Sequence, residues 1–179
     1  MQARPGRTHS DRWSASEEGE AISLIRQSVP AQPITFAAQP NPLVADLSKS
    51  ALLIIDMQND FLDAEGWFAT TRGAEVADLS DITATINALS AGFRRAAAPV
   101  IHINWAVRPD TANLPANVLD KGSACGRQPG YGDSIGSGPV LVAGAWGAQS
   151  IPAIDKSPQD IEVGKHRLPG FRDNALDQI

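Results

Sequence analysis

A carboxylate stands at the end of a short, unbroken apolar run. Residues 51–55 read Ala-Leu-Leu-Ile-Ile, and Asp56 follows them directly, before the polar turn at 57–60. Such a run is typical of a strand buried on both faces, as in the centre of a parallel sheet. Because open α/β sheets bind their ligands beyond the carboxyl ends of the strands, Asp56 is the first catalytic candidate.

A lysine follows a second candidate strand in the same way. Residues 160–163 alternate polar and apolar side chains, which predicts a half-exposed strand at a sheet edge, and Lys165 comes just past its carboxyl end. In a parallel sheet the residues that end two strands point to the same rim, so Asp56 and Lys165 can converge. The structural alternative is that Asp56 caps the next turn or forms an ion pair with Lys165 that only supports the fold.

The elements between these two residues predict a βαβ unit with parallel strands. Residues 100–103 form a further apolar strand, after Pro99. Residues 105–159 form a long insert rich in Gly and Pro, and inserts of this length are usually functional loops. Apolar residues at spacings of three and four predict one face of a helix before Pro99: Val76, Leu79, Ile82, Ile86, Leu89 and Phe93.

Length and composition bound the class of protein. The chain has 179 residues, enough for one domain with a core, and its 42% hydrophobic and 20% charged residues are typical of a soluble globular protein. The net charge of −5 gives no electrostatic case for nucleic acid or an anionic membrane. Residues 1–9 lack the apolar core of a signal peptide, so we expect none, and no apolar run approaches the roughly 18 residues that span a bilayer. We expect a cytoplasmic protein whose partner is a small-molecule substrate.

Residues 1–47 read as a partly disordered extension ahead of a globular region at 48–179. The apolar residues near Ile22 allow a short helix around 15–27, and four prolines between 30 and 42 argue against any regular element there.

Two stretches carry a family resemblance. Residues 56–61 read Asp-Met-Gln-Asn-Asp-Phe, and residues 164–171 read Gly-Lys-His-Arg-Leu-Pro-Gly-Phe. With the strand before the first, they resemble the isochorismatase-like cysteine hydrolase family over roughly residues 48–179. Arg-Pro-Asp at 108–110 and Leu-Pro-Ala-Asn at 114–117 look most like its ureido and biuret-type amidohydrolases.

The resemblance implies a three-layer α/β/α fold. Its parallel sheet has six strands in the Rossmann-like order 3-2-1-4-5-6, of which residues 48–179 hold the first three. The full-length form of such a protein is expected to be a homo-oligomer.

The resemblance also implies a reaction carried out by a Cys, Asp and Lys set. Asp56 is the general base that takes the proton of the thiol, and Lys165 is the cation that supports the developing charge. The implied reaction is hydrolysis of a C–N bond in a small amide or ureido compound through a thioester-type intermediate. Cleavage of a vinyl ether, as in isochorismate, is an alternative.

The nucleophile of the family comes after a further strand, beyond Ile179. We therefore expect a C-terminally truncated chain, and an inactive fragment or pseudoenzyme is an alternative reading. Cys125 lies upstream of Lys165 in a loop with no strand before it, so we do not assign it the nucleophilic role.

Aromatic and polar residues near the two strand ends are candidates for substrate binding. They could wall a small planar substrate or orient its carbonyl or carboxylate, and core packing or loop hydrogen bonding is the alternative for each: Phe61, Asn104, Trp105 and Arg108. Some nicotinamidase-like members hold a metal with an Asp and His residues after the second strand. Residues 103–108 contain neither type, so we expect no metal, and we expect no cofactor.

A rival motif lies in the insert. Gly-Asp-Ser-Ile-Gly at 132–136 matches the nucleophile elbow of a serine hydrolase, with Ser134 as nucleophile and Asp155 or Asp160 and His166 as its partners. The elbow needs a strand before it and a helix after it, and loop residues flank this one on both sides. A serine hydrolase is therefore a remote alternative.

Overall fold

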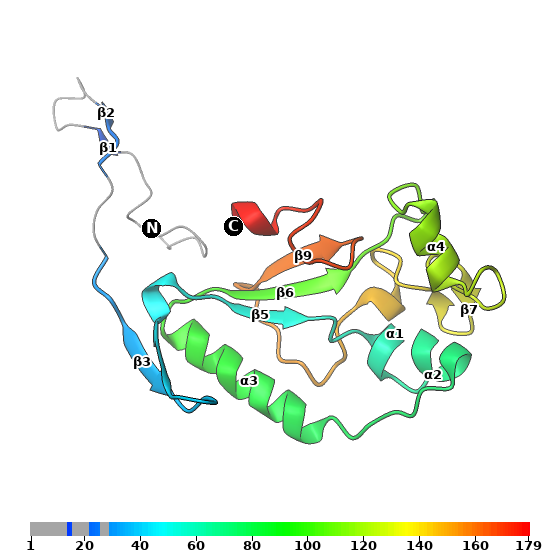
Figure 1. Cartoon of the computed structure of the whole chain (residues 1–179), viewed down its shortest axis with the longest axis horizontal. Helices are drawn as coiled ribbons and strands as arrows, with labels where there is room; N and C mark the ends of the chain where they lie inside the picture. Colours follow the sequence, from blue (N-terminus) through cyan, green and yellow to red (C-terminus); the bar gives the residue numbers. More distant parts are fainter. Residues whose placement is uncertain (1–13, 16–21, 26–28) are drawn as a thin grey trace.

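Three parallel strands form the centre of the domain. The computed structural model describes residues 14–15, 22–25 and 29–179, and its parallel sheet has the order β5 (Leu52–Ile55), β6 (Val100–Trp105), β9 (Ile161–Lys165) (Figure 1). Backbone hydrogen bonds pair β6 with both neighbours in parallel register. The predicted α/β class, the parallel sheet and the edge position of the last strand are confirmed. The expectation that the first strand is buried on both faces is wrong in the described sheet, because β5 lies at its other edge and Ile55 is exposed.

The bounds of the last strand differ from the prediction. β9 begins at Ile161 and ends on Lys165, whereas we expected a strand over 160–163 with Lys165 beyond it. Asp160 precedes the strand, and its carboxylate binds Arg94, from the helix before β6, and His102 of β6. Trp105 and Lys165 are direct neighbours across the β6–β9 pair, which brings Lys165 to the carboxyl edge of the sheet.

Helix α3 (Ser80–Arg95) connects β5 to β6 and packs against both (Figure 1). The predicted helix is confirmed, but its predicted apolar face is wrong at Ile82 and Leu89, which are exposed. Thr83 and Ser90 are buried in their place. The two small hydroxyl residues can face the sheet because each bonds a carbonyl of its own helix four residues back. The opposite face of the sheet is covered by the segment after β9, which ends in η4 (Leu176–Gln178) and contributes Leu176 to a core cluster with Ile103.

The insert after β6 is packed rather than loose. It contains α4 (Ala116–Gly122), the two-residue strands β7 (Ser134–Ile135) and β8 (Gly138–Pro139), and the 3-10 turn η3 (Trp146–Ala148). Together with α1 (Asn59–Leu62) and α2 (Trp67–Arg72) these elements lie at the carboxyl end of the sheet (Figure 1). A second core cluster holds them there, and its fully buried members are Trp67, Trp105, Val107, Leu114, Val140 and Leu141.

The region before residue 48 contains strands that we did not predict. β3 (Pro33–Phe36) and β4 (Leu43–Asp46) form an antiparallel hairpin, followed by η2 (Leu47–Lys49), in spite of the prolines. β1 (Ser14–Ala15) pairs with β2 (Ile22–Ser23), so the helix expected around 15–27 is wrong at these residues, and the rest of that range lies outside the described residues. None of the helices in the part of the chain that the structure describes is long and apolar enough to cross a membrane.

Candidate active site

Asp56 and Lys165 meet at the carboxyl edge of the sheet. Lys165 Nζ donates to Asp56 Oδ2 at 2.7 Å, and the side chains are 4% and 30% exposed, respectively. Asp56 has a φ of +56°, in the left-handed region that Asp tolerates better than most residues, and its N–H donates to the carbonyl of Ile103. The backbone therefore turns at the point where β5 ends, and the predicted convergence of the two charged residues is present.

One carboxylate oxygen of this pair is free. Asp56 Oδ2 accepts from Lys165, while Oδ1 is buried and has no hydrogen-bond partner among the described residues. Burial raises the pKa of Asp56 above its ordinary value, and the hydrogen bond and charge of Lys165 oppose that rise without cancelling it. A carboxylate with a raised pKa and an unused oxygen is suited to accept a proton.

The ring of Trp105 packs beside the Asp56–Lys165 pair. It is buried, and Lys165 Nζ lies 5.2 Å from the centroid of its ring, a cation–π distance. The ring of Tyr131, from the insert, stacks on Trp105 with centroids 4.9 Å apart and planes 24° apart. The sequence predicted Trp105 beside this site, whereas Tyr131 was missed because nothing in its local pattern shows that the insert returns to the end of β6.

Three of the four residues after Asp56 bind the insert, and sequence reasoning did not assign them a role. Gln58 donates to the carbonyls of Trp105 and Ala148 and accepts from the N–H of Trp105. Asn59 donates to the carbonyl of Trp146. Gln58 and Asn59 therefore connect the end of β5 to the end of β6 and to η3. Their side chains point to backbone groups, whereas the side chain of Asp56 binds Lys165.

Asp60 is the third of these residues and is almost fully buried. Its carboxylate accepts from the backbone N–H of Trp67 at 3.2 Å and of Leu141 at 2.7 Å. Burial raises the pKa of Asp60, and the two backbone hydrogen bonds oppose that rise. Gly147 packs directly on this carboxylate, and a Cβ at that position would overlap it. Asp60 thus joins α2, the β8–η3 segment and η3 at one point.

The other three predicted substrate-binding residues each make contacts with residues other than Asp56 and Lys165. Phe61 packs edge-on against Phe68 in the second core cluster. Asn104 is on the face of β6 opposite to Trp105, where it donates to the hydroxyl of Ser150. Arg108 is 62% exposed and forms an ion pair with Asp110 at 2.7 Å. Their contact with substrate stays a prediction.

The remaining candidate nucleophiles are outside this arrangement. Cys125 is exposed, in a turn after α4, and Ser134 lies in β7 without the helix that a nucleophile elbow needs. Asp160, one of the acids proposed for that serine, is occupied by Arg94 and His102 instead of His166. Of the residues that the structure describes, no three side chains of His, Cys, Asp or Glu gather in a way that could hold a metal ion.

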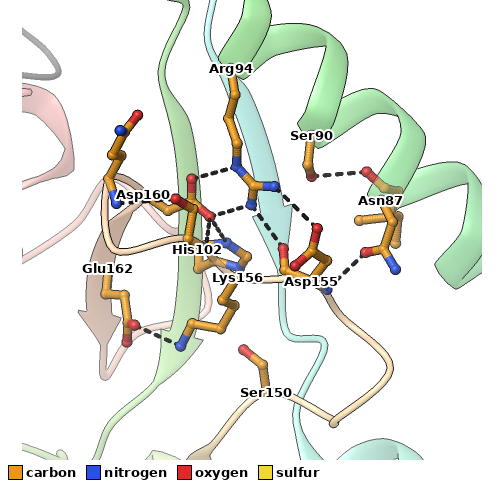
Figure 2. Close-up of polar contacts among 12 residues, drawn as sticks. Asn87, Ser90, Arg94, His102, Ser150, Asp155, Lys156, Asp160 and Glu162 are labelled. Atoms are coloured by element: carbon orange, nitrogen blue, oxygen red, sulfur yellow. Dashed lines mark hydrogen bonds and ion pairs between the residues drawn. The ribbon is translucent and has the colours of Figure 1, made fainter.

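A second buried polar cluster lies on the α3 side of the sheet (Figure 2). Arg94 donates from Nε to Asp160 Oδ1 at 2.9 Å and from Nη2 to Oδ2 at 2.5 Å, and His102 Nε2 lies 3.1 Å from Oδ2. Because a carboxylate only accepts, His102 carries its proton on Nε2, and Nδ1 is buried without a partner among the described residues. Burial raises the pKa of Asp160, but the hydrogen bonds from Arg94, Ser157 and His102 together lower it below its ordinary value. This cluster joins α3, β6 and the start of β9.

Two shallow hollows lie on the insert. The larger has a volume of about 420 Å³ and is lined by residues 123–133, and the smaller, of about 240 Å³, is lined in part by Thr111, Tyr131 and Asp133. Neither is lined by Asp56 or Lys165. The Lys165 side chain is buried, and the Asp56 side chain is 30% exposed, so the ion pair reaches the surface through Asp56.

Known proteins are similar to this chain in sequence. The isochorismatase domain matches residues 50–179. The chain is 28% identical over 151 residues to the ureidoacrylate amidohydrolase of Pseudomonas syringae pv. syringae, which covers 79% of this chain and 58% of that protein. It is also 28% identical over 167 residues to the ureidoacrylate amidohydrolase of Stutzerimonas stutzeri, over 88% of this chain and 64% of that protein. The chain thus spans about three fifths of the length of these relatives.

Solved structures agree on the fold. An isochorismatase family protein from Desulfovibrio vulgaris aligns with a TM-score of 0.51 and 26% identity, over 72% of this chain and 58% of that one. A cysteine hydrolase from Pseudomonas syringae pv. phaseolicola aligns with a TM-score of 0.56 and 20% identity, over 75% of this chain and 54% of that one. The isochorismatase domain match covers β5, β6 and β9, and the structural similarity agrees with it. The chain therefore belongs to the isochorismatase family.

Proposed function

We propose that this protein is the Asp- and Lys-bearing part of a hydrolase that cleaves a C–N bond in a small amide or ureido compound. The observation that carries the proposal is the Lys165–Asp56 pair at the sheet edge, with one buried carboxylate oxygen left unpartnered. The 28% identity to two ureidoacrylate amidohydrolases supports the amide and ureido class over the vinyl-ether alternative.

In this proposal Asp56 Oδ1 takes the proton from a cysteine thiol. The thiolate attacks the carbonyl carbon, the C–N bond breaks, and the amine leaves with the proton that Asp56 returns. Water then attacks the thioester carbon while Asp56 again accepts a proton, the C–S bond breaks, and Asp56 returns that proton to the sulfur. Lys165 holds Asp56 in the ionised form before the first transfer and offers a positive charge to the developing anion.

The thiol is the missing element. Cys125 is exposed on the insert and has no described contact with Asp56 or Lys165, so the proposal does not assign it the nucleophilic role. That observation favours a second candidate function for residues 1–179 alone, which is binding of a small amide or ureido compound without turnover.

The test compares the 179-residue chain with the product of the complete reading frame. Both are assayed for hydrolysis of a ureido acid, a simple amide and a vinyl ether, with Asp56→Asn and Lys165→Met variants and the exposed Asp78→Asn as a control. We expect turnover of the ureido acid or the amide only by the complete product, and a loss of about 10²–10⁴-fold in kcat/KM for Asp56→Asn.

Two outcomes contradict the proposal. Full activity of the Asp56→Asn variant would remove Asp56 from the reaction. Turnover of the vinyl ether alone would change the substrate class. Ligand binding without turnover by both proteins would favour the second candidate function.

A further inference from the structure

The order of the sheet places one strand between the two charged residues of the site. Asp56 follows β5 and Lys165 ends β9, and β6 lies between these strands. Because neighbouring strands are about 4.8 Å apart, the Lys165 side chain has to cross the end of β6 to reach Asp56. Trp105 is the last residue of β6 and the direct neighbour of Lys165 across the β6–β9 pair. The path of the Lys165 side chain therefore passes Trp105.

Three groups in the described part of the chain contact the Lys165 ammonium. Nζ donates to Asp56 Oδ2 at 2.7 Å and to the carbonyl of Leu168 at 3.4 Å, and it lies 5.2 Å from the centroid of the Trp105 ring. An ammonium has three N–H donors, and the negative face of an indole ring attracts a cation. Since the Lys165 side chain is 4% exposed, the ammonium is enclosed by these contacts and acts on the reaction through Asp56.

Trp105 is itself held in a fixed position. The side chain of Gln58 binds its backbone N–H and carbonyl, the ring of Tyr131 stacks on its ring, and the residue is 3% exposed. A ring this deeply buried offers almost no surface to a substrate, which argues against the substrate contact that the sequence suggested. Trp105 can still act on the site through the ammonium beside its ring.

We propose that Trp105 is a positioning residue of the Asp56–Lys165 site, whose ring holds the Lys165 ammonium against Asp56 Oδ2 by a cation–π contact and so leaves Oδ1 as the oxygen that accepts the proton. The inference rests on the proposed function, because the proton transfer belongs to it. Lysine has a flexible four-carbon stem, and the ring limits the positions that Nζ can take. The contact is strong for its kind because both residues are buried and little water competes with the ring.

The experiment changes the charge distribution of the ring and keeps its shape. Tryptophans with increasing ring fluorination are inserted at position 105 of the 179-residue protein, and each added fluorine makes the ring face less negative and weakens its hold on a cation. The Asp56 pKa is read from carbon-13 NMR of its carboxyl carbon. We expect this pKa to rise along the series, because Lys165 spends less time against Asp56 and opposes the effect of burial less. A constant or falling Asp56 pKa would overturn the inference, since a ring that only fills space is indifferent to fluorine.

Trp67 supplies the matched control. It belongs to the same core cluster, and its own cation–π partner is Arg72, whose guanidinium carbon lies 4.9 Å from the ring centroid. The same fluorinated residues at position 67 should leave the Asp56 pKa unchanged. An equal rise from position 67 would trace the effect to the cluster as a whole and overturn the inference.

Activity of the complete reading frame separates this inference from the proposed function. With the fluorinated series at position 105, we expect kcat for the ureido acid or the amide to fall about three- to tenfold while KM changes little, as for the loss of one buried cation–π contact. If Asp56→Asn leaves turnover unchanged, the proposed function fails and this inference fails with it.

Two further results would contradict only the role of Trp105. If Asp56→Asn abolishes turnover but the series changes neither the Asp56 pKa nor kcat, Trp105 does not position Lys165 and the proposed function stands. If KM rises along the series while the Asp56 pKa of the ligand-free protein is constant, Trp105 contacts the substrate instead.

Discussion

The side chain of Gln58 binds both backbone polar groups of Trp105. Its Oε1 accepts from the Trp105 N–H at 2.7 Å, and its Nε2 donates to the Trp105 carbonyl at 2.9 Å. A primary amide thereby takes the place of the next residue of β5, which has turned away from the sheet after Asp56. The Gln58 side chain thus extends the β5–β6 hydrogen bonding by one residue of β6. The side chain of Asp56 takes no part in this pairing and binds Lys165 instead.

Removing this amide should lower stability. Gln58→Ala leaves the N–H and carbonyl of Trp105 and the carbonyl of Ala148 without this partner in a buried position, so we expect a loss of about 3 kcal/mol in the free energy of unfolding. Urea unfolding measures it, with the exposed Gln159→Ala as control. Equal midpoints for the two variants would show that water replaces the amide.

The ion pair at the rim can be tested without substrate. Lys165→Met keeps a long side chain against Trp105 but removes the hydrogen bond and the charge that lower the pKa of Asp56. We therefore expect that pKa to rise further, as measured by carbon-13 NMR of the Asp carboxyl carbons. Lys156→Met, which breaks a more exposed pair with Glu162, should leave it unchanged. A constant Asp56 pKa in Lys165→Met would mean that the pair does not form in solution.

The buried cluster around Asp160 should contribute to stability in a pH-dependent way. Asp160→Asn leaves Arg94 and His102 without their shared carboxylate, and we expect a loss of about 3 kcal/mol at neutral pH. Asp155→Asn, which removes the exposed partner of Arg94, should cost about 0.5 kcal/mol or less.

The sign of the pH dependence follows from the lowered pKa of Asp160. The folded protein binds this proton less readily than the unfolded chain, so the carboxylate stabilises the fold above its ordinary pKa of 3.8. That contribution is lost as the pH falls from 3.8 through the lowered value in the folded state. Urea midpoints measured through this acid range should fall more steeply for the native protein than for Asp160→Asn, and parallel curves would contradict the assignment.

Close contact between Gly147 and Asp60 predicts a further effect. Gly147→Ala places a Cβ on the Asp60 carboxylate, and we expect a loss of about 1–3 kcal/mol because η3 must move. Gly136→Ala is the matched control, since nothing lies within 4 Å of a Cβ there and its φ is not positive. Thermal unfolding compares the two, and an equal effect on both would show that η3 yields without cost.

The amino-acid sequence was sufficient to predict the sheet and its charged rim. A run of apolar residues before Asp56, an apolar strand near Ile101 and an alternating strand before Lys165 are local patterns, and each of them corresponds to a strand in the structure. The burial of β5 on both faces, which the first pattern also predicted, is absent because β5 is an edge strand of the described sheet. Parallel strands end at one edge, so the meeting of Asp56 and Lys165 follows from those patterns without any knowledge of the insert.

Periodicity was a poor guide to the buried face of α3. Ile82 and Leu89 fit the apolar spacing but are exposed, while Thr83, Ser90 and Arg94 face the sheet. Part of the facing surface is polar, because it includes His102 of β6 and Asp160, which precedes β9. The period of the helix sequence does not record this property of its partners.

The tertiary structure alone decided which residues complete the rim. The roles of Gln58, Asp60 and Tyr131 depend on where a long insert returns to the sheet, and such contacts join residues far apart in the chain that no local period or spacing records. The sequence by itself determined the family, the parallel strands and the carboxylate–ammonium pair. The packing of the insert decided which of its backbone groups Gln58 and Asp60 bind at the carboxyl end of the sheet.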